Sequence, residues 1–116
     1  MEKVTYTEIE KFVNKVVHKF DPHRVILFGS YANSLESPDS DVDLLVIMDF
    51  DGRPQHQAFN IRREIRRNFP LDLIVRRPSD VNYRLAEGDF FLKDILENGK
   101  VLYERTDHGM DNGRSY

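Results

Sequence analysis

Apolar side chains recur along this chain with two spacings, one typical of helices and one typical of strands. Between Ile9 and Phe20 they return every three or four residues, with lysine and asparagine on the opposite side. This pattern predicts an amphipathic helix that Asp21-Pro22 ends. The same spacing predicts a second helix over residues 57–68 and a third from about Asp89 to Gly99.

The start of the first helix contains two candidate capping boxes, each a threonine followed three residues later by a glutamate. Thr7 with Glu10 is one frame, and Thr5 with Glu8 is the competing frame. Further along the chain, Ser79-Asp80 is suited to capping a turn or a helix.

Short apolar runs between these segments predict four strands. They cover residues 25–28, about 42–48, 71–75 and 101–103. Strands that alternate with helices are typical of the α/β class, so we expect a small sheet with helices packed on it.

The stretch from Val25 to Val46 joins two of these strands and carries the first candidate chemistry. Gly29-Ser30 ends one apolar run, and Asp41 and Asp43 open the next after a spacer of ten residues. Side chains two apart on a strand point the same way, so these carboxylates lie roughly 6–7 Å apart along it. Their repulsion costs about 3 kcal/mol at an effective dielectric of about 20, and a divalent cation would relieve it.

The residue types on the two sides of this spacer suit a nucleotide. Gly29 lets the backbone approach a ligand closely, Ser30 adds a hydroxyl, and the amides of a following turn suit phosphate. Carboxylate oxygens select Mg²⁺ or Mn²⁺ over Zn²⁺. A phosphate-binding turn that faces a metal-binding carboxylate pair predicts nucleotide chemistry.

Taken singly, each half of this pattern is common in proteins without such a function. A Gly-Ser pair is a frequent turn, and Asp-x-Asp is usually a solvated strand end. Asp49 and Asp51 repeat the spacing but continue into Gly52 and Arg53-Pro54, so we predict a loop there. The placement of both halves between apolar runs favours the functional interpretation for Asp41 and Asp43.

A third carboxylate, Asp72, lies inside the predicted strand at residues 71–75. An ionised carboxylate in an apolar strand is costly unless it is paired, solvated or bound to a metal. Asp72 therefore faces water on an edge strand, pairs with an arginine of the second helix, or is a metal ligand.

Length and composition narrow the class of protein. The 116 residues suffice for one domain with a modest core, which we assign to residues 1–105. We expect residues 106–116, which lack an apolar period, to be disordered. The net charge of −3 argues against a general nucleic-acid binder. The absence of cysteine fits a cytoplasmic protein, and no apolar run is long enough to cross a membrane.

Two further groups of side chains need an interpretation. Four arginines make the second predicted helix strongly basic, and a solvated face is favoured over a site for an acidic partner or for phosphates. These arginines are Arg62, Arg63, Arg66 and Arg67. At the start of the third helix, Phe90 and Phe91 are assigned to the core or to an interface rather than to base stacking.

Gly29-Ser30, the ten-residue spacer and Asp41-x-Asp43 resemble the signature of the DNA polymerase β-like nucleotidyltransferases. More narrowly, the chain is similar to the minimal nucleotidyltransferases that prokaryotes encode beside HEPN proteins as antitoxins. The similarity extends from about Val4 to Glu104. The family often continues Gly-Ser-aromatic-Ala-Arg-Gly, whereas here Asn33-Ser34 follows Tyr31-Ala32.

The resemblance implies a fold and a reaction. The fold is α/β, a small mixed β-sheet with flanking helices that forms the nucleotidyltransferase catalytic core. The reaction is transfer of AMP from ATP with release of pyrophosphate. It implies that two Mg²⁺ ions, or Mn²⁺, are held by Asp41 and Asp43, and that Asp72 completes the site and helps to deprotonate the attacking hydroxyl. Gly29 and Ser30 would hold the β- and γ-phosphates.

The resemblance also implies a partner. The catalytic core accounts for nearly the whole chain, so we expect the acceptor hydroxyl to come from elsewhere, as a tyrosine of a HEPN-type ribonuclease toxin. Three alternatives stay open: an inert antitoxin that masks the toxin, a transferase for a small hydroxylated molecule, and a transferase for RNA ends. The intact Asp41, Asp43 and Asp72 disfavour the first. The lack of a substrate domain disfavours the second, and the acidic charge balance disfavours the third.

Overall fold

The computed structural model describes residues 4–106, which form four helices and four strands. In chain order the elements are α1 (Tyr6–Phe20), β1 (Arg24–Phe28), β2 (Val42–Ile47), α2 (Pro54–Glu64), β3 (Leu71–Arg76), α3 (Pro78–Ala86), α4 (Phe90–Asn98) and β4 (Lys100–Glu104). The predicted disordered tail lies outside the described residues apart from Thr106.

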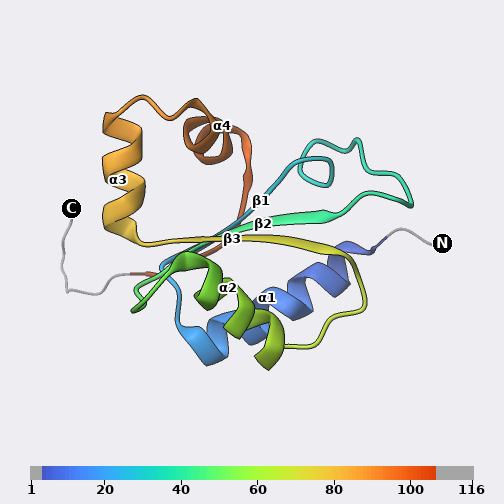
Figure 1. Cartoon of the computed structure of the whole chain (residues 1–116). Helices are drawn as coiled ribbons and strands as arrows, with labels where there is room; N and C mark the ends of the chain where they lie inside the picture. The colour runs from blue at the N-terminus through green and yellow to red at the C-terminus, as the bar shows by residue number, and fades with distance from the viewer. Residues whose placement is uncertain (1–3, 107–116) are drawn as a thin grey trace.

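The four strands form one mixed sheet in the order β3-β2-β1-β4 (Figure 1). β1 runs antiparallel to both β2 and β4, whereas β2 and β3 run parallel. The expected α/β fold with a small mixed sheet and flanking helices is therefore confirmed. β3 and β4 are the edge strands.

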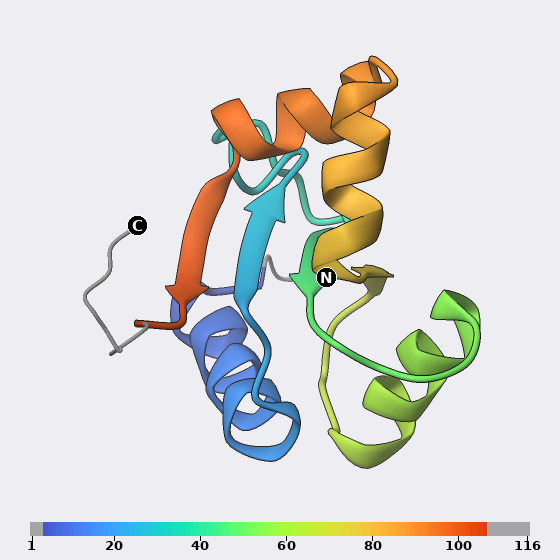
Figure 2. The same cartoon turned by 90° about the vertical axis from the view of Figure 1, so that its left-hand side faces the viewer.

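Helices cover both faces of the sheet in two pairs. Figure 1 shows α1 and α2 beneath the strands and α3 and α4 above them, and Figure 2 shows α3 and α4 from the side. Strand side chains alternate between the two layers: Leu44 packs in the core with α1 and α2, and Leu45 packs in the core with α3 and α4. Asp43 follows the alternation of Leu45, and Asp72 that of Ile74. Both carboxylates therefore lie on the face that α3 and α4 cover.

The first helix is capped by Thr5, in the earlier of the two candidate capping boxes. The amide of Glu8 donates to the Thr5 hydroxyl at 3.2 Å, and the Thr5 amide donates to the Glu8 carboxylate at 2.7 Å. Thr5 is thus the N-cap, and the Thr7–Glu10 frame is wrong because Thr7 already lies inside the helix. The reciprocal bonds satisfy two amides that would otherwise lack a partner.

The second helix is displaced from the predicted residues 57–68. Pro54 occupies its first turn, where a fixed φ favours the helix, and Ile65 leaves it with an extended backbone (φ −124°, ψ 117°). The apolar spacing nevertheless identified the buried side, because Ile61, Ile65 and Phe69 are all buried. After Ile65 the chain turns to enter β3, so the buried positions continue although the helix does not.

This early helix end also separates the four arginines. Arg62 donates to the carbonyl of Leu71 at 2.9 Å, and Arg66 and Arg67 lie beyond the helix. Glu64 pairs with Lys19 at 2.8 Å. The arginines therefore do not form one solvated helical face.

The last two helices differ in how well they were predicted. Asp89 caps α4 by accepting from the amide of Leu92, as the predicted boundary requires. α3 begins at Pro78 after Arg77, so Ser79-Asp80 lies inside the helix and the predicted cap is wrong. Proline in the first turn starts this helix without a side-chain cap.

Phe90 and Phe91 do not belong to the core. Their exposed fractions are 81% and 55%, so the assignment to the core is wrong. The buried side of α4 is formed by Leu92 and Ile95 instead.

Among residues 4–106, no helix combines the length and the apolar character that crossing a membrane requires.

Candidate active site

The backbone positions of the candidate carboxylates are neighbours where β2 and β3 begin. In the sheet register, Asp43 lies opposite Phe28 of β1 on one side and Asp72 of β3 on the other. Asp41 lies two residues before Asp43, immediately ahead of β2. The fold thus brings Asp41, Asp43 and Asp72 together at one end of the sheet, on the face of α3 and α4.

Gly29 lies directly against Asp43. A β-carbon built on Gly29 would come within 2.1 Å of Asp43 Oδ2 and 3.1 Å of its Cγ. Gly29 also has φ +74°, a left-handed conformation that side chains other than glycine rarely adopt. Two independent constraints therefore require glycine where the turn meets the carboxylate.

The residues after Gly29 form a compact turn. The carbonyl of Gly29 accepts from the amides of Ala32 and Asn33 at 3.1 and 3.2 Å and from Asn33 Nδ2 at 3.0 Å. Tyr31 is buried in the core, and its hydroxyl accepts from the Val4 amide. Gly29 and Ser30 are thereby held beside Asp43 by a folded turn rather than by a free loop.

Ser34 takes the left-handed conformation in this turn, with φ 58°. This is the position at which the resemblance in the sequence would place glycine. The backbone requirement for a left-handed residue is thus present although the glycine is not.

The charges at the site act on one another. Burial raises the pKa of Asp43 to about 6, and the negative charges of Asp72 and then Asp41 add to the increase. A carboxyl group with this pKa holds its proton more strongly than an exposed aspartate does. The ionised form of Asp43 would therefore be stabilised by a positive charge nearby.

The side chains themselves do not converge on one point. In residues 4–106, no three His, Cys, Asp or Glu side chains are grouped so as to hold a metal ion. The backbone register and the electrostatic coupling bring the three carboxylates near one another, whereas mutual repulsion favours side-chain rotamers that keep like charges apart. The assignment of Asp41, Asp43 and Asp72 as metal ligands stays a prediction.

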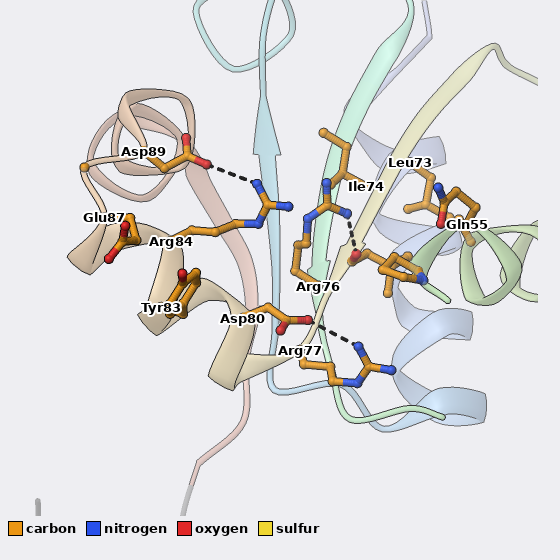
Figure 3. A pocket seen from close by; sticks show the side chains of 14 residues that line it. Gln55, Leu73, Ile74, Arg76, Arg77, Asp80, Tyr83, Arg84, Glu87 and Asp89 are labelled. Atoms are coloured by element: carbon orange, nitrogen blue, oxygen red, sulfur yellow. Dashed lines mark hydrogen bonds and ion pairs between the residues drawn. The ribbon is translucent and has the colours of Figure 1, made fainter. Parts of the chain in front are cut away.

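A pocket of about 1060 Å³ opens beside the site along β3 (Figure 3). Its wall runs from the start of α2 across β3 to the loop between α3 and α4. On the β3 side it begins with Leu73, the residue after Asp72. The groove therefore begins one residue along β3 from Asp72, and Asp41, Asp43 and Asp72 are not among its lining residues.

With this geometry in place, comparison with known proteins identifies the family. The sequence profile described as "Polymerase beta, Nucleotidyltransferase" matches residues 10–108. The chain belongs to this nucleotidyltransferase family.

Two relatives of this nucleotidyltransferase occur in Methanocaldococcus jannaschii. The protein named "Putative protein adenylyltransferase MJ1305" is 33% identical over 114 residues, covering 90% of this chain and 75% of the relative. The protein named "Putative protein adenylyltransferase MJ0604" is 27% identical over 99 residues, covering 82% and 94%.

Solved structures share the nucleotidyltransferase fold. One, described as a "putative nucleotidyltransferase from Sulfolobus solfataricus", gives a TM-score of 0.59 at 22% identity and covers 85% of this chain and 79% of that one. Another, described as "the toxin-antitoxin with AMP-PNP", gives a TM-score of 0.53 at 19% identity and covers 84% and 74%. At these identities the likeness concerns the fold.

Several residues around the nucleotidyltransferase site were missed in the sequence. The ring of Phe91 packs edge-on against Phe28, with centroids 5.8 Å apart, so an aromatic pair flanks Asp43. In the sequence, the one indication of this pair was that Phe28 directly precedes Gly29-Ser30. Arg76 follows Asp72 by four residues on β3. Because side chains on a strand alternate with a period of two, the sequence could have indicated that both lie on the same face.

Proposed function

We propose that this nucleotidyltransferase transfers AMP from ATP to a tyrosine hydroxyl of a HEPN-type toxin and so acts as an antitoxin. The observation that carries the proposal is the register that sets Asp43 beside Asp72 while Gly29 lies against Asp43. The names of the two relatives support protein adenylylation as the reaction. The fold shared with a protein of a toxin–antitoxin structure containing AMP-PNP supports the antitoxin role.

The residues at the site fit Mg²⁺ or Mn²⁺. Asp41, Asp43 and Asp72 supply carboxylate oxygens only, the donor type that these cations prefer. The raised pKa of Asp43 reflects negative charge that a cation would compensate. We assign these three residues as ligands. When bound, the ions neutralise the charge that develops on the phosphates and on the attacking and leaving oxygens.

The other residues of the site bind and orient the nucleotide. The turn that starts at Gly29 allows close approach of phosphate to its backbone, and the Ser30 hydroxyl adds a hydrogen-bond donor. We assign the β- and γ-phosphates of ATP to Gly29 and Ser30. This places the α-phosphate toward the carboxylates and leaves the β3 side of the site open to the acceptor.

In the proposed reaction the acceptor oxygen forms a bond to the α-phosphorus while the bond to the bridging oxygen of pyrophosphate breaks. The hydroxyl proton passes to Asp72 or to water, and pyrophosphate leaves with the electron pair of the broken bond. The protein forms no covalent bond to the substrate. Its contribution is positioning and charge neutralisation.

The test begins with a search for a HEPN-type protein encoded beside this chain, and that protein is then incubated with the chain, ATP and Mg²⁺. Intact-mass spectrometry should show an increase equal to AMP less water, and tandem spectrometry should place it on tyrosine. The Asp41→Asn variant should give no increase. An unmodified toxin that this variant still silences would contradict the enzymatic proposal and favour masking by contact.

A further inference from the structure

Two arginines converge at the centre of the groove beside the active site. Figure 3 shows the guanidinium group of Arg84, from α3, directed toward that of Arg76, from β3, which donates to the carbonyl of Val75. Arg76 is half-buried and Arg84 is exposed. Two like charges this close repel each other, so an anion bound between them would be stabilised by both.

The carboxylates of the chain compensate this positive charge only in part. Arg84 reaches Asp89 at 3.5 Å, a long contact, while Asp89 also accepts the capping hydrogen bond from Leu92. Arg76 donates to the carbonyl of Val75 at 2.7 Å, and no carboxylate of residues 4–106 forms an ion pair with it. Burial, and then the charge of Arg84, lower the pKa of Arg76, and the negative charges of Asp80 and Asp89 offset part of this decrease.

Arg77 provides an internal contrast within the same groove. It pairs with Asp80 at 3.3 Å, donates to the carbonyl of Phe50 at 3.0 Å and stacks over the Phe50 ring at 4.1 Å. These contacts fix Arg77 as a structural residue that closes the loop after β2. Within residues 4–106, Arg76 donates to the Val75 carbonyl and Arg84 pairs with Asp89, so each has fewer partners than Arg77, and both line the groove.

We propose that Arg76 and Arg84 form an anion-binding site for an acidic side chain of the acceptor polypeptide. The inference rests on the proposed function and deepens it, because it assigns the acceptor to the groove along β3. Asp89 can keep its hydrogen bond from the Leu92 amide when Arg84 leaves it. Arg84 is then available to pair with the carboxylate of the acceptor.

The position of the groove favours a polypeptide over the nucleotide. The phosphates are assigned to Gly29 and Ser30, at the end of β1, whereas the groove lies beyond β2 along the edge strand β3. Its lining mixes charged groups with apolar side chains such as Leu73 and Ala58, the combination that protein–protein interfaces use.

The spacing along β3 makes the proposal specific. Arg76 follows Asp72 by four residues, which corresponds to roughly 13 Å along a strand. An acceptor segment extended along the groove would therefore carry its acidic residue about four residues from the modified one. This gives a sequence feature to seek in the partner.

The first test measures binding without catalysis. The Asp41→Asn chain is immobilised, and the affinity of the HEPN-type partner identified for the test of the proposed function is measured without ATP. Arg84→Ala, an exposed substitution, and Arg76→Ala with Arg84→Ala should weaken binding by roughly tenfold or more. Arg63→Ala removes the same charge from α2, outside the groove, and should leave binding unchanged.

The second test compares ATP affinity and charge reversal. The groove variants should bind Mg²⁺-ATP as the wild type does. Arg84→Glu should recover binding when the acidic residue of the partner is replaced by arginine. Unchanged partner affinity in the double variant, no binding of the partner by any variant, or an equal loss of ATP affinity would each overturn the anion site. Binding that depends on Arg84 without AMP transfer by the wild type would overturn only the proposed reaction.

Discussion

The carboxylate of Asp43 lies so close to the α-carbon of Gly29 that a β-carbon there would come within 2.1 Å of Asp43 Oδ2. A contact this short cannot be relieved without moving the carboxylate or the turn. Gly29 and Asp43 belong to the two halves of the sequence signature and are fourteen positions apart in the chain. Their contact means that the turn and the carboxylate constrain each other sterically. Any side chain at Gly29 disturbs both the turn and the carboxylate.

Gly29→Ala should lower the free energy of unfolding by about 2–4 kcal/mol, since it adds a clash to a strained left-handed backbone. It should also weaken the binding of Mg²⁺-ATP, because Asp43 has to move. Urea unfolding measures the first effect, and calorimetric titration measures the second.

Gly52→Ala is the matched control for that substitution. Gly52 has φ +84°, but a β-carbon there meets nothing within 4 Å. Its cost should be the backbone strain alone, about 1–2 kcal/mol, with ATP binding unchanged. Equal effects of the two substitutions on stability and on ATP affinity would contradict the contact between Gly29 and Asp43.

The pKa of Asp43 predicts how stability without metal depends on pH. Because the folded state raises this pKa from 3.8 to about 6, it binds the proton more tightly than the unfolded state. The resulting stabilisation is complete below about pH 4 and is lost as the pH rises through 6. Asp43→Asn has no charge to bury, so in a chelating buffer it should be more stable than the wild type at pH 8.

The stability gap between Asp43→Asn and the wild type should close as the pH falls from 8 to 4. Thermal melts across this range, in the chelating buffer, measure it. Asp51→Asn, in the exposed bend after β2, should show no such trend. A gap of constant size at every pH would argue against burial and like charge as the cause of the shift.

Much of the fold followed from local patterns because the buried side of each element repeats with a fixed period. Ile9, Phe12, Val13 and Val16 of α1 are buried as their spacing predicts, and so are the strands at Val25 and Leu44. The ends of helices were harder to predict than their buried sides. The start of α2 depends on Pro54, and its end depends on the extended backbone of Ile65, where the chain turns toward β3. The order of the strands also depends on pairings that no local pattern contains.

The candidate site could be proposed from the sequence because its residues follow short spacings. Asp41 and Asp43 share a strand end, and Asp72 was noticeable because a charge interrupts an apolar run. The convergence of Arg76 with Arg84 was not predictable, since it depends on how α3 packs against the sheet. The contact of Phe91 with Phe28 was missed for the same reason.

The carboxylates should be needed for transfer but not for folding. Asp41→Asn and Asp72→Asn should each reduce the rate of AMP transfer at least about 100-fold, because loss of a metal ligand removes several kcal/mol of transition-state stabilisation. Both variants should unfold cooperatively, at denaturant concentrations no lower than the wild type. The quantity to measure is the initial rate with the HEPN-type protein at saturating ATP.

Asp49→Asn tests whether the position of the carboxylate matters. Asp49 belongs to the second Asp-x-Asp pattern, but it lies beyond β2 at the other end of the strand and pairs with His23 at 2.8 Å. The rate of transfer should be unchanged in this variant. A wild-type rate in Asp41→Asn or Asp72→Asn would show that the metal assignment is wrong.

Asn33 and Ser34 have separable roles in the turn, and the last prediction distinguishes them. Asn33 Nδ2 donates to the carbonyl of Gly29, so Asn33→Ala should lower the free energy of unfolding by about 1 kcal/mol and weaken ATP binding. Ser34 instead carries strain at φ 58°, and Ser34→Gly should raise the free energy of unfolding by up to about 1 kcal/mol. Because glycine keeps the backbone of the turn, ATP affinity should be preserved. Urea unfolding and calorimetry on both variants measure these effects. A destabilised Ser34→Gly, or an Asn33→Ala variant with unaltered ATP affinity, would mean that the turn does not hold Gly29 and Ser30 in the way that the phosphate assignment requires.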